Sequence, residues 1–396
     1  MTEKSKSYFI EIACFQKNKH GNIVCGDTFL SRRAKEQNRY VAVLSDGLGS
    51  GIKANVLSTI TASMALNFTL RRESIQRTAE AIMKTLPIDS HRGISYATFT
   101  VLAIDNDGEV QAAEYDNPFV VLKNGKVLKL QKQAVSINNP NGGCGELLIS
   151  RFQLHKNDRI VLFSDGISQS GMGNKDMPFG WGEDAICSFI ENVVSESPDI
   201  SAYSLARKIV LKAELNDIFR LKDDASCAVA YLRSPRKLIV CTGPPYSKDN
   251  DSRLAAMLAG YSGKKIVCGG TTAKIIAREL NTDITVDLTT EDPELPPISK
   301  MDGVDLISEG ILTLSKVEKL LEEGASEDSV GSGAAYDIVR LLMKSDIIDF
   351  VVGTKVNEAH QDPSLPVELE IRRNVVKRIC SLLEDRYIKQ VGVTFI

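Results

Sequence analysis

Short runs of apolar residues separated by polar turns dominate the chain up to about residue 234. These runs predict β-strands over residues 8–15, 40–45, 96–104, 109–115, 119–123, 126–130, 147–154, 159–164 and 225–232. Apolar positions recur at helical spacing over about residues 53–70, 74–86, 183–193 and 200–216. Strands in hairpins with helices outside them predict an α+β layered sandwich for a first domain over residues 1–234.

After Ser234-Pro235 the pattern changes to alternating strands and helices. Strands are predicted over residues 237–241, 265–268, 284–288, 304–307, 348–352 and 391–395. Helices are predicted over residues 252–259, 272–280, 315–322, 335–344 and 371–384, and a surface loop over 292–297. This alternation predicts a Rossmann-like α/β domain with a mostly parallel sheet over residues 235–396.

Composition and charge narrow the class of protein. The chain has 396 residues, of which 43% are hydrophobic and 25% charged, and its formal net charge is −3. A net charge near zero creates no overall positive potential that would attract nucleic acid or an anionic membrane. The start of the chain is polar and no 18-residue apolar run occurs, so we expect a cytoplasmic protein without a membrane segment.

The cysteines and histidines form no recognisable disulfide, metal or catalytic pattern. The eight cysteines contain no C-x-x-C pair, and the four histidines are far apart in the sequence. The sequence therefore indicates neither a disulfide framework nor a zinc site, and no Ser-His or Cys-His nucleophile pattern stands out.

Aspartates cluster where predicted strands begin or end. The strands over residues 40–45 and 159–164 both lead into Ser-Asp-Gly, with Asp46 and Asp165 as the aspartates. Asp27 follows the first strand, and Asp223 and Asp224 precede the last strand of the domain. Because buried strands hold their ends rigidly, these carboxylates can converge at one edge of a sheet.

Converging carboxylates suit hard divalent cations such as Mg²⁺ or Mn²⁺, since they would otherwise repel one another or take up protons. A glycine after the aspartate lets the backbone turn and leaves a carbonyl available as a further oxygen ligand. A single Asp-Gly is more often a turn, but two matching segments with Asp27 upstream and Asp223-Asp224 downstream favour a metal site.

These segments resemble the metal-dependent Ser/Thr protein phosphatases of the PPM family, in particular the SpoIIE-like bacterial branch. Residues 44–51 (LSDGLGSG) are similar to its S-D-G-M-G-x-G segment, and residues 96–100 (YATFT) to its central A-T strand. Residues 162–167 (LFSDGI) and 223–226 (DDAS) match its two later segments. The resemblance covers about residues 8–233 and implies the PPM αββα layered sandwich.

The resemblance implies a site for two divalent cations, Mn²⁺ or Mg²⁺. Asp46 would bridge the two ions, and the Gly47 carbonyl would bind one of them. Asp165 and Asp223 would complete the binding site of the other ion. Asp27 would support one ion through water, and Asp224 would have a role next to these ligands. The implied reaction is hydrolysis of phosphoserine or phosphothreonine by a metal-activated water. The implied partner is a phosphoprotein of the anti-sigma-factor antagonist type.

Two segments depart from the family pattern. Ser50 stands where many relatives have histidine, and residues 114–118 (EYDNP) stand where many have N-A-G-H-x-P. These differences bear on how substrate is positioned and leave the metal ligands in place. Asp116 is either a further site carboxylate or only a hairpin residue.

In the second domain, two apolar strands lead through Cys241 and Cys268 into small residues. The second leads into Gly269, Gly270, Thr271 and Thr272 before a predicted helix, where backbone N–H groups and two hydroxyls could hold an anionic small-molecule ligand. Ordinary loop and N-cap chemistry explains the same residues equally well. No dinucleotide fingerprint or P-loop is present, and a redox or metal role for the two cysteines is disfavoured.

Three hypotheses for function follow. The first is a metal-dependent protein Ser/Thr phosphatase with a C-terminal regulatory domain. The second is a PPM-fold scaffold or sensor whose second domain binds a small anion. The third places catalysis in the second domain, which has no recognisable catalytic motif.

Overall fold

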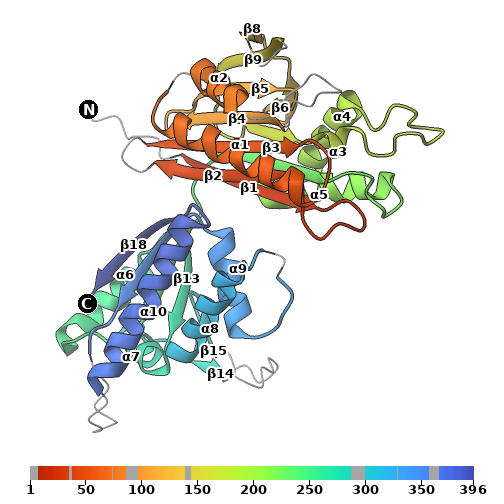
Figure 1. Ribbon diagram of the computed structural model, residues 1–396. Coiled ribbons are helices and arrows are strands. Elements are labelled where there is room, and N and C mark those ends of the chain that lie inside the picture. Colours follow the sequence, from red (N-terminus) through yellow and green to blue (C-terminus); the bar gives the residue numbers. More distant parts are fainter. Residues whose placement is uncertain are drawn as a thin grey trace. The chain divides into compact units, whose positions relative to one another are not determined.

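The computed structural model describes residues 8–34, 38–73, 75–85, 97–138, 144–286, 299–327, 329–355 and 365–396. The chain divides into two compact units, Met1–Ser234 and Pro235–Ile396 (Figure 1). Each unit is described by itself.

The first unit contains a sheet of six described strands in the order β2-β3-β4-β5-β9-β8, all antiparallel to their neighbours. Their bounds are Thr28–Ala34 (β2), Arg39–Gly47 (β3), Ala97–Asp105 (β4), Glu109–Tyr115 (β5), Cys144–Gln153 (β9) and Gln133–Asn138 (β8). Strand β3 lies between β2 and β4 and is buried along most of its length, so its last residues, Asp46 and Gly47, are held firmly opposite Thr98 and Ala97 of β4.

The second sheet of this unit has five described strands in the order β1-β11-β10-β6-β7. Their bounds are Phe9–Lys17 (β1), Ala225–Arg233 (β11), Arg159–Phe163 (β10), Phe119–Lys123 (β6) and Lys126–Leu128 (β7). Strand β11 is an interior strand, with β1 and β10 on either side, and is buried throughout. Asp223 and Asp224 therefore lead into one of the most deeply buried strands of the unit.

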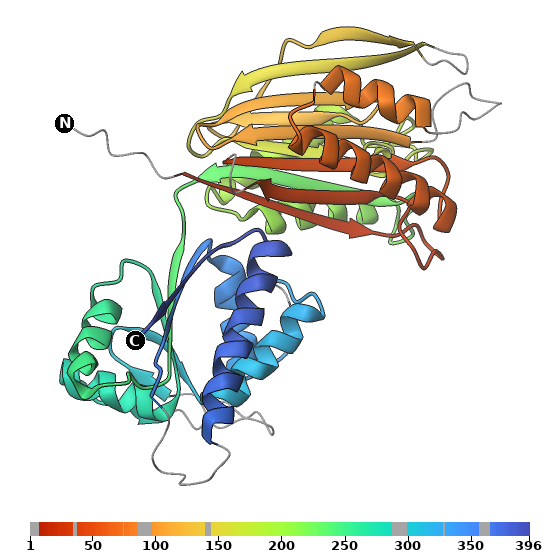
Figure 2. The same ribbon diagram turned by 60° about the vertical axis from the view of Figure 1, so that its left-hand side comes forward.

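Helices cover the outer faces of both sheets. The helices α1 (Ile52–Leu70) and α2 (Ile75–Thr85) share a hydrophobic core with the six-stranded sheet, built on residues such as Val43, Leu66 and Val101. The helices α4 (Glu183–Glu196) and α5 (Ala202–Asn216) share another with the five-stranded sheet, including Val161 and Ile209. Figure 2 shows α1 and α2, in red and orange, on one side of the strands and the green helices on the other.

Two aromatic pairs join the inner faces of the sheets. Phe9 of β1 meets Tyr40 of β3 edge to face at 6.4 Å between ring centroids, and Phe119 of β6 stacks on Phe152 of β9 at 6.1 Å. Each pair takes one ring from each sheet, so the sheets pack face to face. The αββα sandwich predicted from the sequence is confirmed.

The second unit is built on a sheet of seven described strands in the order β14-β15-β16-β13-β12-β17-β18. The parallel part comprises β12 (Lys237–Thr242), β13 (Lys264–Cys268), β16 (Val304–Ser308), β17 (Ile347–Val352) and β18 (Gln390–Phe395). The short strands β14 (Thr285–Val286) and β15 (Ser299–Met301) add an antiparallel edge. The chain order of the parallel strands reverses between β12 and β17, as in a doubly wound α/β sheet.

The helices of this unit lie on both faces of its sheet. One core joins the sheet to α6 (Asp251–Ala259) and α7 (Gly270–Leu280), and the other joins it to α8 (Ile311–Glu322), α9 (Ala334–Lys344) and α10 (Leu365–Asp385). In Figure 2 the green α6 and α7 lie on one side of the strands and the blue α8 and α10 on the other. The Rossmann-like arrangement with a mostly parallel sheet is confirmed.

Several elements differ from the prediction. The edge strand β2 is missed because it contains polar residues and no residue that is fully buried, and β8, β15 and the one-turn helix α3 (Asp165–Ser168) are missed as well. The strand predicted over 284–288 is antiparallel and described only as β14. Helices α8 and α10 begin earlier than predicted. The loop expected over 292–297 lies outside the described residues.

No helix in the described part of the chain combines the length and the apolar character that crossing a bilayer requires. The cytoplasmic location expected from the sequence stays a prediction.

Candidate metal site

Two of the predicted aspartates stand where strands of different sheets end. Asp46 is the second-last residue of β3, and Asp165 opens the helix α3 directly after Ser164 and β10. Burial raises the pKa of Asp46, and the carboxyl group of Asp165 raises it further, so the two side chains are neighbours. The structure therefore brings together the aspartates of the two matching Ser-Asp-Gly segments.

Asp27 and Asp224 occupy the same region. Asp224 Oδ2 accepts a hydrogen bond from the Gly26 N–H, and its Oδ1 accepts one from the Lys19 N–H, each at 2.9 Å. Asp224 is 3% exposed and Asp27 is also 3% exposed. One buried carboxylate thus holds both ends of the loop that leads to Asp27.

Two serines connect β10 to β11 beside Asp27. The Ser226 N–H donates to Ser164 Oγ at 3.0 Å, and the Ser164 N–H donates to the Ser226 carbonyl at 3.0 Å. Burial is the largest influence on the pKa of Asp27 and raises it, while the hydroxyls of both serines lie close enough to lower it in part. These serines form a polar support for Asp27 that connects two neighbouring strands.

Glycines after the aspartates permit close approach of other backbone segments. A Cβ at Gly47 would lie 2.1 Å from the Ala54 carbonyl oxygen of α1, and a Cβ at Gly166 would lie 2.1 Å from the Asp224 carbonyl oxygen. No side chain fits in either place, because backbone atoms cannot move aside as a flexible side chain does. The glycines of the two Asp-Gly pairs are therefore required by packing alone.

The helix α1 fixes the loop from its other side. Asn55 Nδ2 donates to the Cys25 carbonyl at 2.8 Å, and Ser58 Oγ donates to the Gly26 carbonyl at 2.6 Å. Gly26 is therefore bound by α1 through its carbonyl and by Asp224 through its N–H.

Burial and neighbouring carboxylates destabilise the charged forms of Asp27, Asp46 and Asp223. Burial is the largest cause that raises the pKa of Asp46 well above its ordinary range, followed by the charges of Asp27, Asp165 and Asp223. Burial likewise raises the pKa of Asp27 to about 7, with Asp224 and Asp165 adding to it. The pKa of Asp223 is raised by burial and by Asp165, and lowered by the Asp224 N–H and by Lys19. Such a cluster is stabilised by positive charge.

The donor set fits hard cations. Asp27 Oδ2 is buried and has no hydrogen-bond partner, which is costly unless a cation or its water occupies the space beside it. Among the described residues, no three His, Cys, Asp or Glu side chains are already positioned to hold a metal ion. The carboxylates are nevertheless neighbours whose charges repel one another. The aspartates offer only carboxylate oxygens as ligands, and oxygen ligands suit Mg²⁺ or Mn²⁺.

Some contributors were not identified from the sequence. Ser164 and Ser226 were quoted only as parts of motifs, and Gln169, whose Nε2 donates to Asp165 Oδ2 at 3.0 Å, was not considered. A serine preceding the aspartate in both Ser-Asp-Gly segments was the available signal for Ser164. In the other segment, Ser45 Oγ donates to the Thr98 carbonyl at 2.9 Å.

The segment that departs from the family pattern links the two sheets. Strand β5 ends at Tyr115 in one sheet and β6 begins at Phe119 in the other, so Asp116 is not the turn of a hairpin. Asp116 is exposed and has φ 52°. Glu114 Oε1 accepts hydrogen bonds from the Phe119 N–H at 3.0 Å and from Lys132 Nζ at 2.9 Å, which fixes this crossing.

In the second unit, Gly269 is the N-cap of α7, and Gly270, Thr271 and Thr272 form its first turn. All four residues line a cavity of about 240 Å³. Cys241 and Cys268 are buried and free, and burial raises the pKa of each thiol to about 12, which makes both unreactive.

Comparisons with known proteins address the first unit. A family model described as stage II sporulation protein E (SpoIIE) matches residues 36–233. Among curated proteins none matches the chain.

Solved structures give more distant similarities. The phosphatase domain of the cell fate determinant SpoIIE from Bacillus subtilis is 18% identical, with 58% of this chain and 94% of that chain covered and a TM-score of 0.43. The RsbU and RsbW domains of a Mycobacterium tuberculosis protein are 17% identical, with 63% of this chain and 67% of that chain covered and a TM-score of 0.46. RsbX in complex with magnesium is 16% identical, with 56% of this chain and 95% of that chain covered and a TM-score of 0.37. Similarity at this level is too low to indicate a shared substrate.

Proposed function

The chain belongs to the SpoIIE family over residues 36–233, and we propose that it is a metal-dependent protein phosphatase that hydrolyses phosphoserine or phosphothreonine on a regulatory protein. The observation that carries the proposal is that Asp27, Asp46, Asp165 and Asp223 lie close enough for their charges to act on one another, with Asp27 Oδ2 buried and without a hydrogen-bond partner. Burying charges that repel one another costs stability, so a protein that retains such a cluster gains from a bound cation.

The residues divide into ligands and supports. Asp46, the Gly47 carbonyl, Asp165 and Asp223 would hold two divalent cations, Mn²⁺ or Mg²⁺. When bound, the cations supply positive charge that acidifies a water molecule and neutralises the phosphoryl oxygens. Asp27, which lies beside Ser164 and Ser226, would act through a water molecule.

Asp224 would act as a positioning residue, because both of its oxygens already accept backbone hydrogen bonds. Its part is to place the loop that carries Asp27, and the idea that it is itself a ligand stays a prediction.

The proposed substrate class is a phosphoprotein of the anti-sigma-factor antagonist type, which rests on the family resemblance. The second unit would regulate the first, with a small ligand as the signal. A location in the cytoplasm agrees with such a substrate.

The test is release of phosphate from a phosphoserine peptide and from p-nitrophenyl phosphate in the presence of Mn²⁺. We expect activity in the wild-type chain that is lost with EDTA and falls by at least about 100-fold in Asp46→Asn and Asp165→Asn. Asp107→Asn is the matched control, since Asp107 is an exposed turn residue between β4 and β5.

Wild-type protein that remains inactive with Mn²⁺ on several phosphopeptides would contradict the proposal. The scaffold hypothesis would then describe the first unit better, with the fold retained and catalysis absent. Equal activity of Asp46→Asn and the wild type would contradict the assignment of the site.

A further inference from the structure

The cavity lined by Gly269, Gly270, Thr271 and Thr272 lies in the α/β unit and takes no part in the cluster of aspartates. Its volume is about 240 Å³, and it lies beyond the carboxyl ends of β12, β13 and β16. Ligands of doubly wound sheets bind at this edge, near the point where strand order reverses. That reversal lies between β12 and β17, which end in Thr242 and Val352.

Two helix N-termini meet at this cavity. Gly269 is the N-cap of α7 and Gly310 the N-cap of α8, and neither helix has a side-chain capping hydrogen bond. A Cβ built at Gly310 would lie 3.6 Å from Gly269 Cα, so the two caps are in contact. The first N–H groups of a helix have no partner within the helix, and the helix dipole adds positive charge there. Together the two ends favour an anion.

A buried hydroxyl group points to a ligand independently of the helix ends. Thr272 lines the cavity, is 1% exposed, and its Oγ1 is buried without a hydrogen-bond partner. This oxygen lies 3.2 Å from where a Cβ of Gly269 would be, so it is directed toward the open side of that glycine. Because buried hydroxyls are normally hydrogen-bonded, a ligand atom in the cavity would supply the missing partner.

Arg372 of α10 adds a positive charge to the same wall. A Cβ at Gly243 would lie 2.7 Å from Arg372 Nη1, and Gly243 has φ 81°, so glycine is required where the guanidinium approaches the end of β12. A guanidinium near two helix N-termini is a typical arrangement for holding a phosphate group.

Glu309 narrows the chemistry of the ligand. It lines the cavity at the end of β16, and its Oε2 is buried without a hydrogen-bond partner. A carboxylate repels a bare anion but accepts hydrogen bonds from hydroxyl groups, as the acidic residue of dinucleotide-binding sheets does with ribose. The volume is below the range of about 300–1,000 Å³ typical of drug-sized ligands, which favours a small molecule.

We propose that this cavity binds a small phosphorylated polyol such as a sugar phosphate. The phosphate group lies at the N-termini of α7 and α8 with Arg372 and Thr272, and a hydroxyl group of the ligand donates to Glu309. The proposal names the class of ligand that the second unit would sense, and its test measures binding, so it can fail or hold separately from phosphatase activity in the first unit.

The experiment is isothermal titration calorimetry of the full chain with three probes, ribose 5-phosphate, inorganic phosphate and ribose. We expect ribose 5-phosphate to bind more tightly than phosphate, and ribose not to bind. Arg372→Gln and Thr272→Val should weaken binding of ribose 5-phosphate by about ten- to a hundredfold, since each removes a hydrogen bond to a charged group. Glu309→Gln should bring ribose 5-phosphate and phosphate closer in affinity.

Two variants serve as controls. Arg373→Gln changes the adjacent arginine of α10, which lies over the Phe395 ring with 5.4 Å to its centroid. Thr282→Val removes another buried hydroxyl without a partner, just beyond the other end of α7. Both should bind ribose 5-phosphate as the wild type does. Thr272→Val should also leave thermal stability unchanged or raised, because its hydroxyl has no partner in the protein.

Failure of both ribose 5-phosphate and phosphate to bind the folded wild-type chain would overturn the proposal. Unchanged affinity in Arg372→Gln and Thr272→Val would overturn it as well. Equal affinity for the two anions in the wild type would overturn the role of Glu309.

Discussion

The carboxylate of Asp224 accepts a hydrogen bond from the N–H of Gly26 at 2.9 Å, across 198 positions of sequence. Its other oxygen accepts from the Lys19 N–H at the same distance. The start of β11 is thereby tied to the loop that delivers Asp27, and the tie involves only protein atoms. The acidic site is therefore positioned in part before any cation binds.

We predict that Asp224→Asn lowers the free energy of unfolding by about 1–3 kcal/mol even in EDTA, because an amide cannot accept from two N–H groups with both of its heavy atoms. The measurement is urea unfolding followed by fluorescence of Trp181. Trp181 is the only tryptophan and lies in the core beneath α4 and α5, so it reports on the first unit alone. An unchanged midpoint in EDTA would show that Asp224 acts only toward the cation.

Asp46→Asn should have the opposite effect under the same conditions. Burial and the charges of three neighbouring aspartates disfavour the ionised Asp46 carboxyl group. The neutral amide removes that repulsion, so the metal-free variant is expected to be more stable than the wild type near neutral pH. A metal-free Asp46→Asn chain that unfolds at lower urea than the wild type would contradict this account of the cluster.

The sequence predicted which strands end at the site but not what supports them. Asp46 and Asp165 could be found because each follows a run of buried apolar residues with the same Ser-Asp-Gly continuation. The bonds from Asp224 to Lys19 and Gly26 could not, since they depend on a loop folding back across the sheets.

The second unit shows the same division between local pattern and tertiary contact. Its strand and helix alternation predicted the doubly wound sheet, and the residues 269–272 marked a place for an anion. Arg372 gave no signal, because it is about a hundred positions further along the chain and reaches the cavity only through the packing of α10 on the sheet.

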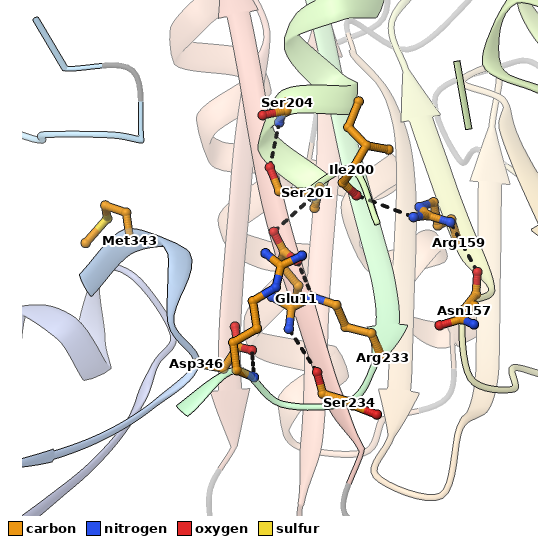
Figure 3. Close-up of polar contacts among 12 residues, drawn as sticks. Glu11, Asn157, Arg159, Ile200, Ser201, Ser204, Arg233, Ser234, Met343 and Asp346 are labelled. Carbon is orange, nitrogen blue, oxygen red and sulfur yellow. Dashed lines mark hydrogen bonds and ion pairs between the residues drawn. The ribbon is translucent and has the colours of Figure 1, made fainter. Parts of the chain in front are cut away.

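A buried ion pair in the first unit allows a stability test away from the metal site. Arg233 Nε donates to Glu11 Oε2 at 2.7 Å, and Glu11 Oε1 accepts from the Ala202 N–H at the start of α5 (Figure 3). Arg233→Leu leaves the Glu11 charge buried and unpaired, and we predict a loss of about 3–5 kcal/mol. Trp181 fluorescence during urea unfolding measures it.

The control is the surface pair of Lys126, which is exposed, and Glu191, which is partly exposed, with Lys126 Nζ 3.0 Å from Glu191 Oε2. Lys126→Leu should change stability by less than about 1 kcal/mol. Equal losses in the two variants would show that burial adds nothing to the pair of Glu11 and Arg233.

The crossing between the two sheets has a predicted pH dependence. Burial raises the pKa of Glu114, and Lys132 pulls it back down. The pKa of Glu114 is therefore higher in the folded than in the unfolded chain. Stability that is present at low pH is lost as the pH rises from the unfolded-state pKa to the folded-state pKa. Lys132→Met widens that interval, so its destabilisation should be about 1 kcal/mol larger near pH 8 than near pH 4.

Urea unfolding at the two pH values tests this, with Lys129→Met as the control because Lys129 is exposed on the same segment. A loss in Lys132→Met that is the same at both pH values would contradict the role of its charge.

The most direct test of the central claim is calorimetric titration of the metal-free chain with Mn²⁺. We predict binding of about two ions per wild-type chain, weaker binding in Asp46→Asn, and an unchanged far-ultraviolet circular dichroism spectrum in both. Absence of Mn²⁺ and Mg²⁺ binding by the folded wild-type chain, or equal binding by Asp46→Asn, would contradict a cation site built from these aspartates.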